Sequence, residues 1–429
     1  MKNILLKNGT VISSTDQIKQ DILIENDNIL ALDSTVDPNS DLEIIDCSGR
    51  LIFPGIIDAH THMGVPIKDG WSADDFESGS KSALNGGVTA IIDFTVLEKN
   101  QSLVESINER NKLAEKSVID VSLHCNITRF DRNLLKEIPQ IMKMGYNSFK
   151  VFTTYEEANM MLKYNQIEEV SKVVYDNSGL LMVHAEDNVV IKEASEPLIA
   201  RKLTHPKYHA IARPTEAEVV AIEKMAEISQ RTGCKTYIVH LNTAKGLNIA
   251  KDCANMYVET CPQYLLLDDS VYEREDGAMF VASPPLRKQE DCAALWQGIE
   301  SGSVDVLATD HCPFMLADKP QGIPFQNIPN GIGGVETLFP VMLNQFIEHR
   351  ISLSRLVELL CENPARIFAL DDNYGELTVG KKANLVIVDP NKIETDWTGK
   401  LRSKTDWNAF SEFPAIFPEK VIISGQVIN

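Results

Sequence analysis

Eight short apolar or β-branched runs, separated by helix-length segments, constrain the fold of this chain most. An amphipathic helix candidate such as 214–233 lies between two of these runs. The alternation is typical of βα units around a parallel sheet, and eight units are the number found in a TIM barrel. A doubly wound open sheet is the alternative. The eight runs lie at residues 51–62, 87–95, 118–126, 147–155, 179–187, 235–243, 255–263 and 304–314.

The two ends of the chain read as a second, smaller unit. Short alternating strands with turn signals occur at 20–33 near the N-terminus and at 375–390 near the C-terminus. Neither end is long enough to form a core alone, and the termini of a domain often lie close together. We therefore expect an α/β fold with one small β-sandwich built from residues 1–54 and 374–429. This sandwich would flank a TIM-barrel domain of residues 55–373.

Charge and hydrophobicity argue against two classes of partner. The formal net charge is −20 over 429 residues, and no basic stripe is present, so binding to a nucleic-acid backbone is not expected. No window approaches the roughly 18 apolar residues of a membrane span, and the apolar pair in MKNILLKNGTVISS is too short for a signal segment. Eight cysteines without a CxxC pair indicate neither disulfides nor a thiolate zinc site. We expect a cytoplasmic protein without a membrane partner.

Histidines and acids gather where the predicted strands end. A TIM barrel builds its active site at the carboxyl ends of its strands. The chain has nine histidines, and it is improbable that five of them reach these positions by chance. The side chains concerned lie near the ends of these runs: His60 and His62 in the first, His184 in the fifth, His240 in the sixth, and Asp310 with His311 in the eighth.

These side chains suit a metal site. His60 and His62 project from the same side of an extended strand, because side chains alternate with period two. Taken singly, His184 and His240 are more often structural histidines; with the HxH pair they are expected to be ligands, since neutral imidazole binds zinc and similar ions. Asp310 could merely cap the next element, but beside such ligands it offers a further ligand and a proton acceptor. His311 would then orient Asp310 or its neighbours.

Lys150 lies in the middle of the apolar stretch GYNSFKVFTTY, residues 145–155. Lysine is rarely buried, because removing an ammonium group from water is unfavourable unless the group is paired or neutralised. A side chain that reaches solvent is the ordinary explanation. Near metal ions, however, the amine would lose its proton, and a neutral amine reacts with carbon dioxide to form an anionic carbamate. Such a group could bridge two metal ions.

At this point the chain resembles a known family. PGIIDAHTHMGVP, SFKVFTTY, MVHAED, IVHLNTAKG, ATDHCPF and IPNGIGGVET look like blocks of the amidohydrolase superfamily, in its cyclic-amidase branch of dihydropyrimidinases and hydantoinases. The resemblance covers essentially the whole chain. It implies a barrel with a flanking β-sandwich and two divalent metal ions, usually zinc. It also implies the ligands: His60 and His62 with Asp310 for one ion, His184 and His240 for the other, and a carbon dioxide-derived carbamate on Lys150 as the bridge.

The resemblance further implies a substrate and its contacts. Tyr155 matches a tyrosine that contacts the substrate and the oxyanion, while Ser283 and Asn330 match positions that bind the ureide edge of the ring. The implied reaction opens a dihydropyrimidine or a 5-substituted hydantoin to an N-carbamoyl amino acid, with Asp310 and Tyr155 as catalytic groups. A homotetramer or homodimer is also implied.

Two departures bear on the substrate. Dihydroorotases resemble this chain but carry an arginine shortly after the HxH pair, where Met63 and Gly64 stand here, so a carboxylated ring is disfavoured. The stretch FTTYEEANMML is not typical of hydantoinases, so the pocket for the exocyclic group is expected to differ. Allantoinase-type, dihydroorotase-type and cyclic-imide hydrolysis stay open as alternatives.

Two readings outside this reaction class also remain. Metal-free scaffold proteins resemble dihydropyrimidinases, but this chain retains all six metal-ligand positions. A heterocycle deaminase on the same fold would not need the bridging Lys150. Metal analysis separates the first reading from an enzyme, and release of ammonia would support the second.

Overall fold

A computed structural model describes residues 3–33, 42–67 and 70–428, and its centre is a parallel eight-stranded barrel. The strands follow one another around the sheet in chain order, and isolated bridge pairing between Thr61 and His311 joins its first and last members. The TIM-barrel prediction is confirmed, and the doubly wound open sheet is wrong because the sheet returns to its first strand. The barrel strands are β8 (Ile56–Thr61), β11 (Val88–Phe94), β12 (Asp120–Asn126), β13 (Ser148–Phe152), β14 (Leu180–His184), β15 (Thr236–Ile238), β16 (Met256–Thr260) and β17 (Val306–Leu307).

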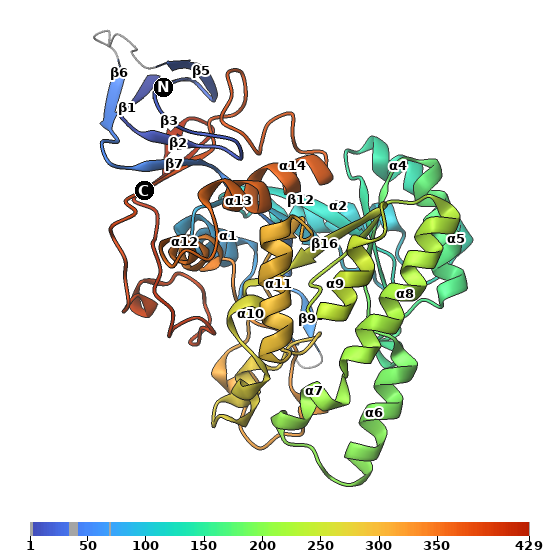
Figure 1. The fold of residues 1–429 in the computed structure, drawn as a ribbon. Helices are drawn as coiled ribbons and strands as arrows, with labels where there is room; N and C mark the ends of the chain where they lie inside the picture. The colour runs from blue at the N-terminus through green and yellow to red at the C-terminus, as the bar shows by residue number, and fades with distance from the viewer. Residues whose placement is uncertain (1–2, 34–41, 68–69, 429) are drawn as a thin grey trace.

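Helices surround this barrel (Figure 1). Several barrel strands are buried along their whole length, as in β8, β11 and β14, which explains why they read as nearly continuous apolar runs. The helices are α1 (Phe76–Asn85), α2 (Leu103–Ala114), α3 (Arg132–Leu135), α4 (Ile138–Lys143), α5 (Tyr164–Asp176), α6 (Asn188–Ala200), α7 (His209–Ala212), α8 (Thr215–Thr232), α9 (Ala244–Lys251), α10 (Pro262–Leu266), α11 (Gln289–Ser301), α12 (Leu338–Ile347), α13 (Leu353–Val357) and α14 (Asn363–Ile367).

Alternate residues of the barrel strands point into two different hydrophobic cores. Ile57 and Ala59 of β8, with Ala90 and Ile92 of β11, belong to a cluster that also contains Phe368, just after α14. A larger cluster forms where the other strand faces meet the surrounding helices. The period-two alternation of a strand thus divides the barrel interior from the helical shell. Among the described helices, none is both long and apolar enough to cross a membrane.

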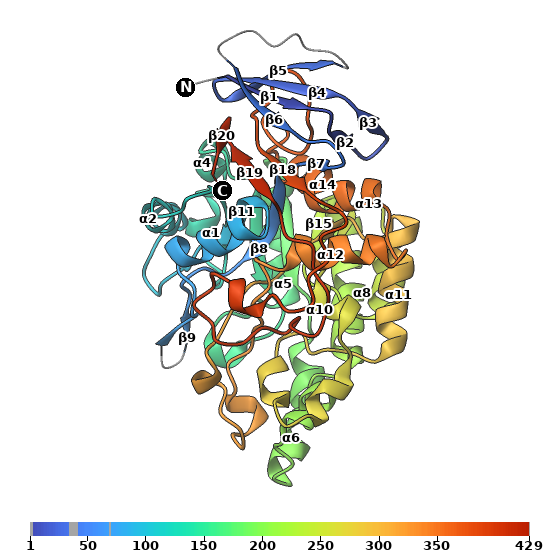
Figure 2. The same ribbon diagram turned by 90° about the vertical axis from the view of Figure 1, so that its left-hand side faces the viewer.

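Two sheets flank the barrel, beside it in Figure 1 and above it in Figure 2. One contains N-terminal strands only, and the other joins strands from both ends of the chain. The first is β5-β4-β1-β6 and the second is β20-β19-β18-β7-β2-β3, in which β7 and β18 pair antiparallel. A short hairpin of β9 (Pro66–Ile67) and β10 (Gly70–Trp71) lies apart from them. The bounds are β1 (Asn3–Lys7), β2 (Thr10–Ile12), β3 (Gln17–Lys19), β4 (Asp21–Glu25), β5 (Asn28–Asp33), β6 (Leu42–Asp46), β7 (Leu51–Pro54), β18 (Leu385–Val388), β19 (Lys420–Ile423) and β20 (Gln426–Val427).

Gly55 marks the passage from the flanking sheet to the barrel. It is the single residue between β7 and β8, so the first apolar run of the sequence serves both units. A Cβ atom at this position would lie 2.1 Å from the Thr89 Oγ1 atom. Any larger residue would therefore push the start of the first barrel strand away from its neighbour.

Residues 389–419, which we call the strap, leave the flanking sheet after β18 and run along the side of the barrel before returning at β19 (Figure 2). Trp397 and Phe410 of the strap are each only 1% exposed and belong to the same cluster as the barrel's helical shell. The Trp397 indole donates a hydrogen bond to the Phe413 carbonyl at 2.8 Å. The strap is therefore part of the packed core.

Candidate active site

All nine residues predicted for the site line one cavity of about 710 Å³. Each lies in a barrel strand or just after one, or lies in a loop that reaches the same end of the barrel. The barrel thus brings together side chains from seven separate stretches of sequence. They are His60, His62, Lys150, Tyr155, His184, His240, Ser283, Asp310 and Asn330.

His60, His62 and Asp310 form a tight cluster. The Asp310 Oδ1 atom lies 3.1 Å from His60 Nε2 and 3.0 Å from His62 Nε2. One ligand atom from each residue can be chosen so that all three lie within 4.8 Å of one another. Asp310 has a positive φ of 53°, and the preceding Thr309 is anchored by its N–H and hydroxyl to the buried Asp58 carboxylate. This anchor directs the Asp310 side chain towards the two imidazoles.

Glu259 of β16 supports this cluster from behind. Its fully buried carboxylate accepts hydrogen bonds from the Tyr237 hydroxyl and the His240 N–H, each at 2.9 Å, and lies 2.7 Å from His60 Nδ1. A carboxylate accepts, so we assign a His60 proton to Nδ1, which leaves Nε2 as the nitrogen that faces Asp310. Burial lowers the pKa of His60, but the Glu259 and Asp310 carboxylates outweigh it and raise that pKa to about 9. The site therefore attracts a cation.

Lys150, His184 and His240 form the second group. Lys150 is 2% exposed, and its Nζ lies 4.9 Å from the ring centre of Phe94. It makes no hydrogen bond or ion pair with any residue in the described part of the chain. Burial lowers the pKa of the amine to about 8, against the attraction of Glu259 and Asp310. Lys150 is thus truly inside the site, not a side chain that reaches solvent.

The two histidines of this group are held differently. Their ring centres lie 4.6 Å apart. His184 Nε2 lies 2.8 Å from Glu186 Oε2, and Glu186 is also paired with the guanidinium of Arg213. His240 Nδ1 is buried and has no hydrogen-bond partner among the described residues.

These donors fit divalent metal ions. His60 Nε2 and His240 Nδ1 are buried polar atoms without a hydrogen bond in the described residues, although an unsatisfied buried polar group is unfavourable. Imidazole nitrogens with a carboxylate are a typical ligand set for zinc and related ions. The cluster of His60, His62 and Asp310 can hold one ion as it stands. The second group has two imidazoles, and Lys150 can join them as a ligand only after losing its positive charge.

Tyr155, Ser283 and Asn330 lie on the cavity wall beyond these groups. Tyr155 adopts the left-handed conformation with φ 69°, and its ring centre lies 4.9 Å from that of His184. Burial raises the pKa of its hydroxyl, so Tyr155 stays a hydrogen-bond donor at neutral pH. The Ser283 hydroxyl is buried and has no partner in full hydrogen-bond geometry among the described residues. The two hydroxyls interact with each other, and both residues line the cavity that a ligand would occupy.

Lys319 joins the two wall segments that carry Ser283 and Asn330. Its buried Nζ donates to the carbonyls of Met279 (3.1 Å), Val281 (2.9 Å) and Gly331 (2.6 Å). Sequence reasoning missed this lysine, because it lies in a loop of no regular pattern. Glu259 was also missed, although a glutamate inside an apolar strand is the same signal that singled out Lys150.

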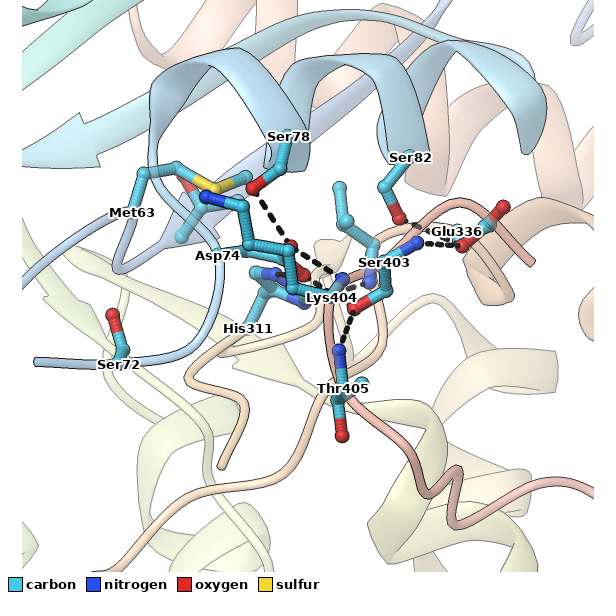
Figure 3. A network of polar contacts seen from close by, with 12 residues as sticks. Met63, Ser72, Asp74, Ser78, Ser82, His311, Glu336, Ser403, Lys404 and Thr405 are labelled. Atoms are coloured by element: carbon cyan, nitrogen blue, oxygen red, sulfur yellow. Dashed lines mark hydrogen bonds and ion pairs between the residues drawn. The ribbon is translucent and has the colours of Figure 1, made fainter. Parts of the chain in front are cut away.

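His311 points away from the cavity, into a polar network beneath the strap (Figure 3). Its Nδ1 accepts from the N–H groups of Gly334 (3.0 Å) and Val335 (3.2 Å), and its Nε2 lies 3.4 Å from the Asp74 carboxylate. Asp74 is fully buried and also accepts from the Ser403 hydroxyl of the strap. This network anchors the residue that follows Asp310.

Comparisons with known proteins agree with this geometry. The sequence model of the Amidohydrolase family matches residues 51–428. D-phenylhydantoinase of Escherichia coli K12 is 37% identical over 420 residues, which are 96% of this chain and 90% of that protein.

Solved structures are similar over nearly the whole chain. Dihydropyrimidinase from Brevibacillus agri superposes with a TM-score of 0.95 at 30% identity, covering 99% of this chain and 95% of that one. L-hydantoinase (dihydropyrimidinase) from Arthrobacter aurescens superposes with a TM-score of 0.92 at 26% identity, covering 100% and 96%. Together with the barrel and its cluster of histidines and a carboxylate, these likenesses show that the chain belongs to the amidohydrolase family, as a cyclic amidohydrolase of the hydantoinase and dihydropyrimidinase branch.

Proposed function

We infer that this protein hydrolyses a ring amide bond of a cyclic ureide, a dihydropyrimidine or a 5-substituted hydantoin, in a metal-dependent reaction. The product would be an N-carbamoyl amino acid. The observation that carries this proposal is the single cavity in which a histidine-carboxylate cluster, a buried lysine and a buried tyrosine converge. The printed names of the relatives, hydantoinase and dihydropyrimidinase, support the ureide ring.

The ligands divide into two sets. His60 and His62 with Asp310 would hold one divalent ion, His184 and His240 would hold the other, and Lys150, as a carbamate, would supply the shared anionic ligand. When bound, two such cations, zinc in the first instance, would supply the chemistry that lowers the pKa of a water molecule and polarises the ring carbonyl.

Lys150 is suited to carbamate formation. A pKa of about 8 leaves a useful fraction of the amine neutral near pH 7.5, and only the neutral amine attacks carbon dioxide. The ammonium form first loses one proton, an N–C bond then forms between the neutral amine and carbon dioxide, and a second proton is released, so the side chain changes from a cation to an anion. This change removes the unfavourable burial of an unpaired ammonium group.

Asp310 serves as the proton carrier. Burial raises its pKa, but His60 and His62 outweigh this and hold the pKa well below its usual range, so the carboxylate is ionised and can accept a proton. It takes the proton of the attacking water and delivers it to the leaving ring nitrogen. Tyr155 donates a hydrogen bond to the oxygen that gains negative charge, while Ser283 and Asn330 bind the ureide edge of the ring.

A substrate panel with metal analysis tests this proposal. Purified protein is stripped with a chelator and reloaded with zinc, manganese or cobalt, then assayed on dihydrouracil, hydantoin, allantoin, dihydroorotate and simple cyclic imides. We expect hydantoin or dihydrouracil to be opened only by the metal-loaded form. Turnover of dihydroorotate alone, of allantoin alone or of imides alone would replace the ureide assignment. A protein that neither binds nor responds to these metals would support a scaffold, and released ammonia would support a deaminase.

Several expectations concern the whole protein. The homotetramer or homodimer, the cytoplasmic location, the identity of the metal and the division into domains at residues 54 and 374 stay predictions. Light scattering of the purified chain would decide the oligomeric state.

A further inference from the structure

The segments after four consecutive barrel strands line the cavity, and they differ in character. Val65 and Pro66 after β8 are apolar, and the stretch Ala158–Met160 after β13 is apolar except for Asn159. The loops that follow β11 and β12 lie between these two segments in the order of the barrel. The wall that they form contains the apolar Leu97 and the polar and cationic side chains of Lys99, Asn126, Thr128 and Arg129.

Arg129 is held in place by the backbone. Its Nη1 donates to the Glu98 carbonyl at 2.8 Å, and its Nη2 donates to the Gln101 carbonyl. A guanidinium has five N–H groups, so three remain for another partner. Arg129 forms no ion pair with a carboxylate in the described part of the chain, although the protein carries a net charge of −20. Its charge is fixed in position but not neutralised.

The other charges around the cavity strengthen this asymmetry. Lys99 is exposed and, like Arg129, forms no ion pair with a described residue. Asp310 is the only carboxylate among the described residues that line the cavity, and it lies against His60 and His62. The wall of Lys99 and Arg129 therefore presents positive charge to any bound molecule. An uncompensated, pre-oriented arginine favours a carboxylate, which it can bind through two hydrogen bonds.

We propose that the preferred substrate is a cyclic ureide whose ring carbon carries a short aliphatic chain ending in a carboxylate, with Arg129 as the main specificity-determining residue and Lys99 as its helper. The aliphatic part contacts Leu97, and the carboxylate meets Arg129. This assignment rests on the proposed hydrolysis of a ureide ring and specifies its substituent. It differs from recognition of dihydroorotate, whose carboxylate is attached directly to the ring and for which the positions after His62 offer no cation.

The reaction then balances as a simple hydrolysis. The ring C–N bond breaks, water supplies a hydroxyl to the carbonyl carbon, and its remaining proton goes to the leaving nitrogen. The product is the N-carbamoyl derivative of a dicarboxylic amino acid.

The test compares two hydantoins of nearly equal size, one with a 5-(2-carboxyethyl) group and one with a 5-(2-carbamoylethyl) group, alongside unsubstituted hydantoin. With the metal-loaded wild-type protein we expect kcat/KM to favour the carboxylate about tenfold, the size of one charge-assisted hydrogen bond partly open to water. The preference should appear mainly in KM and should shrink at high salt, which screens exposed charges.

Variants of Arg129 distinguish an effect of its charge from an effect of its hydrogen bonds to the loop backbone. Arg129→Met should bring the ratio of the two kcat/KM values to about 1, whereas Arg129→Lys, which keeps the charge but not the fork, should retain part of the preference. Lys99→Met should lower the ratio less. Arg132→Met is the matched control, because Arg132 is an exposed arginine that pairs with Glu169 and does not line the cavity, so its ratio should equal that of wild type.

The possible results distinguish the carboxylate preference from the ureide reaction on which it rests. A wild-type ratio of 1 or below, with unsubstituted hydantoin opened normally, would overturn the carboxylate preference and leave the ureide reaction standing. Equal loss in Arg129→Met and Arg129→Lys would show that the loop, not the charge, sets the preference. If none of the three hydantoins and no dihydrouracil is opened, the proposed function itself is wrong.

Discussion

The two halves of the candidate metal site differ in how complete they are. His60, His62 and Asp310 are already in contact, with the carboxylate about 3 Å from both imidazoles. Lys150 lies with His184 and His240 in the same cavity, and its amine has no anionic partner at hydrogen-bonding distance among the described residues. The first half needs only a cation, whereas the second also needs an anion.

This difference follows from charge. In the first half, one encoded carboxylate balances the positive charge that a proton or a metal ion brings. In the second half, a buried ammonium group would repel a metal ion, and burial already lowers its pKa to about 8. A carbamate on Lys150 would give the second half an anion, as Asp310 gives one to the first. Loss of the lysine should therefore remove an anion from the second half, whereas loss of the aspartate carboxylate should affect the first.

The largest effect is expected for Asp310→Asn. The amide keeps the size of the side chain but accepts no proton, so kcat should fall about 10³-fold, within the range typical of general acid-base groups. Steady-state kinetics on the substrate that the panel identifies would measure it, with metal content determined on the same sample. An activity loss below tenfold with full metal content would show that Asp310 is not the proton carrier.

Lys150→Ala should lose activity about 10²-fold or more and bind about one metal ion per chain instead of two, because the second half loses its anion. A short carboxylic acid such as propionate, added to the variant, should restore about tenfold by occupying the place of the carbamate. Elemental analysis and kinetics with and without the acid measure this. Chloride at equal ionic strength is the control, and the wild-type rate should not rise with the acid.

The result for Lys150→Ala also tests whether the two halves of the candidate metal site differ. A variant that keeps two metal ions and full activity would show that the lysine has no part in metal binding. The second half would then bind its metal ion without an added anion, as the first half does.

The smallest effect concerns the supporting carboxylates. Glu259 touches both halves, through His60 Nδ1 and the His240 N–H, while Glu186 touches only His184. Glu259→Gln should therefore weaken metal binding about 10- to 100-fold, the usual range for a group behind a ligand, and Glu186→Gln should weaken it less. Competition with a chromophoric chelator measures both. Equal weakening in the two variants would contradict the division of the site into halves.

Much of the site could be predicted because its residues interrupt regular patterns. The histidines stand where apolar runs end, and Lys150 is a charged residue inside one. Glu259 breaks its strand in the same way and could have been found by the same reasoning. Three other residues could not be predicted in this way: Asp74, Lys319 and Arg129. Each lies in a loop, and its role depends on contacts with distant segments, which a local sequence pattern does not indicate.

The sequence by itself determined the number of barrel strands, their approximate positions and the types of candidate ligand, because apolar periodicity and strand length are local properties of the chain. Only the tertiary structure decided which buried charges meet. Glu259 lies 199 residues from His60, and the Ser403 hydroxyl reaches Asp74 across 329 residues. A buried charge is tolerated only when partners surround it in space, and no local pattern specifies which distant segment will supply them.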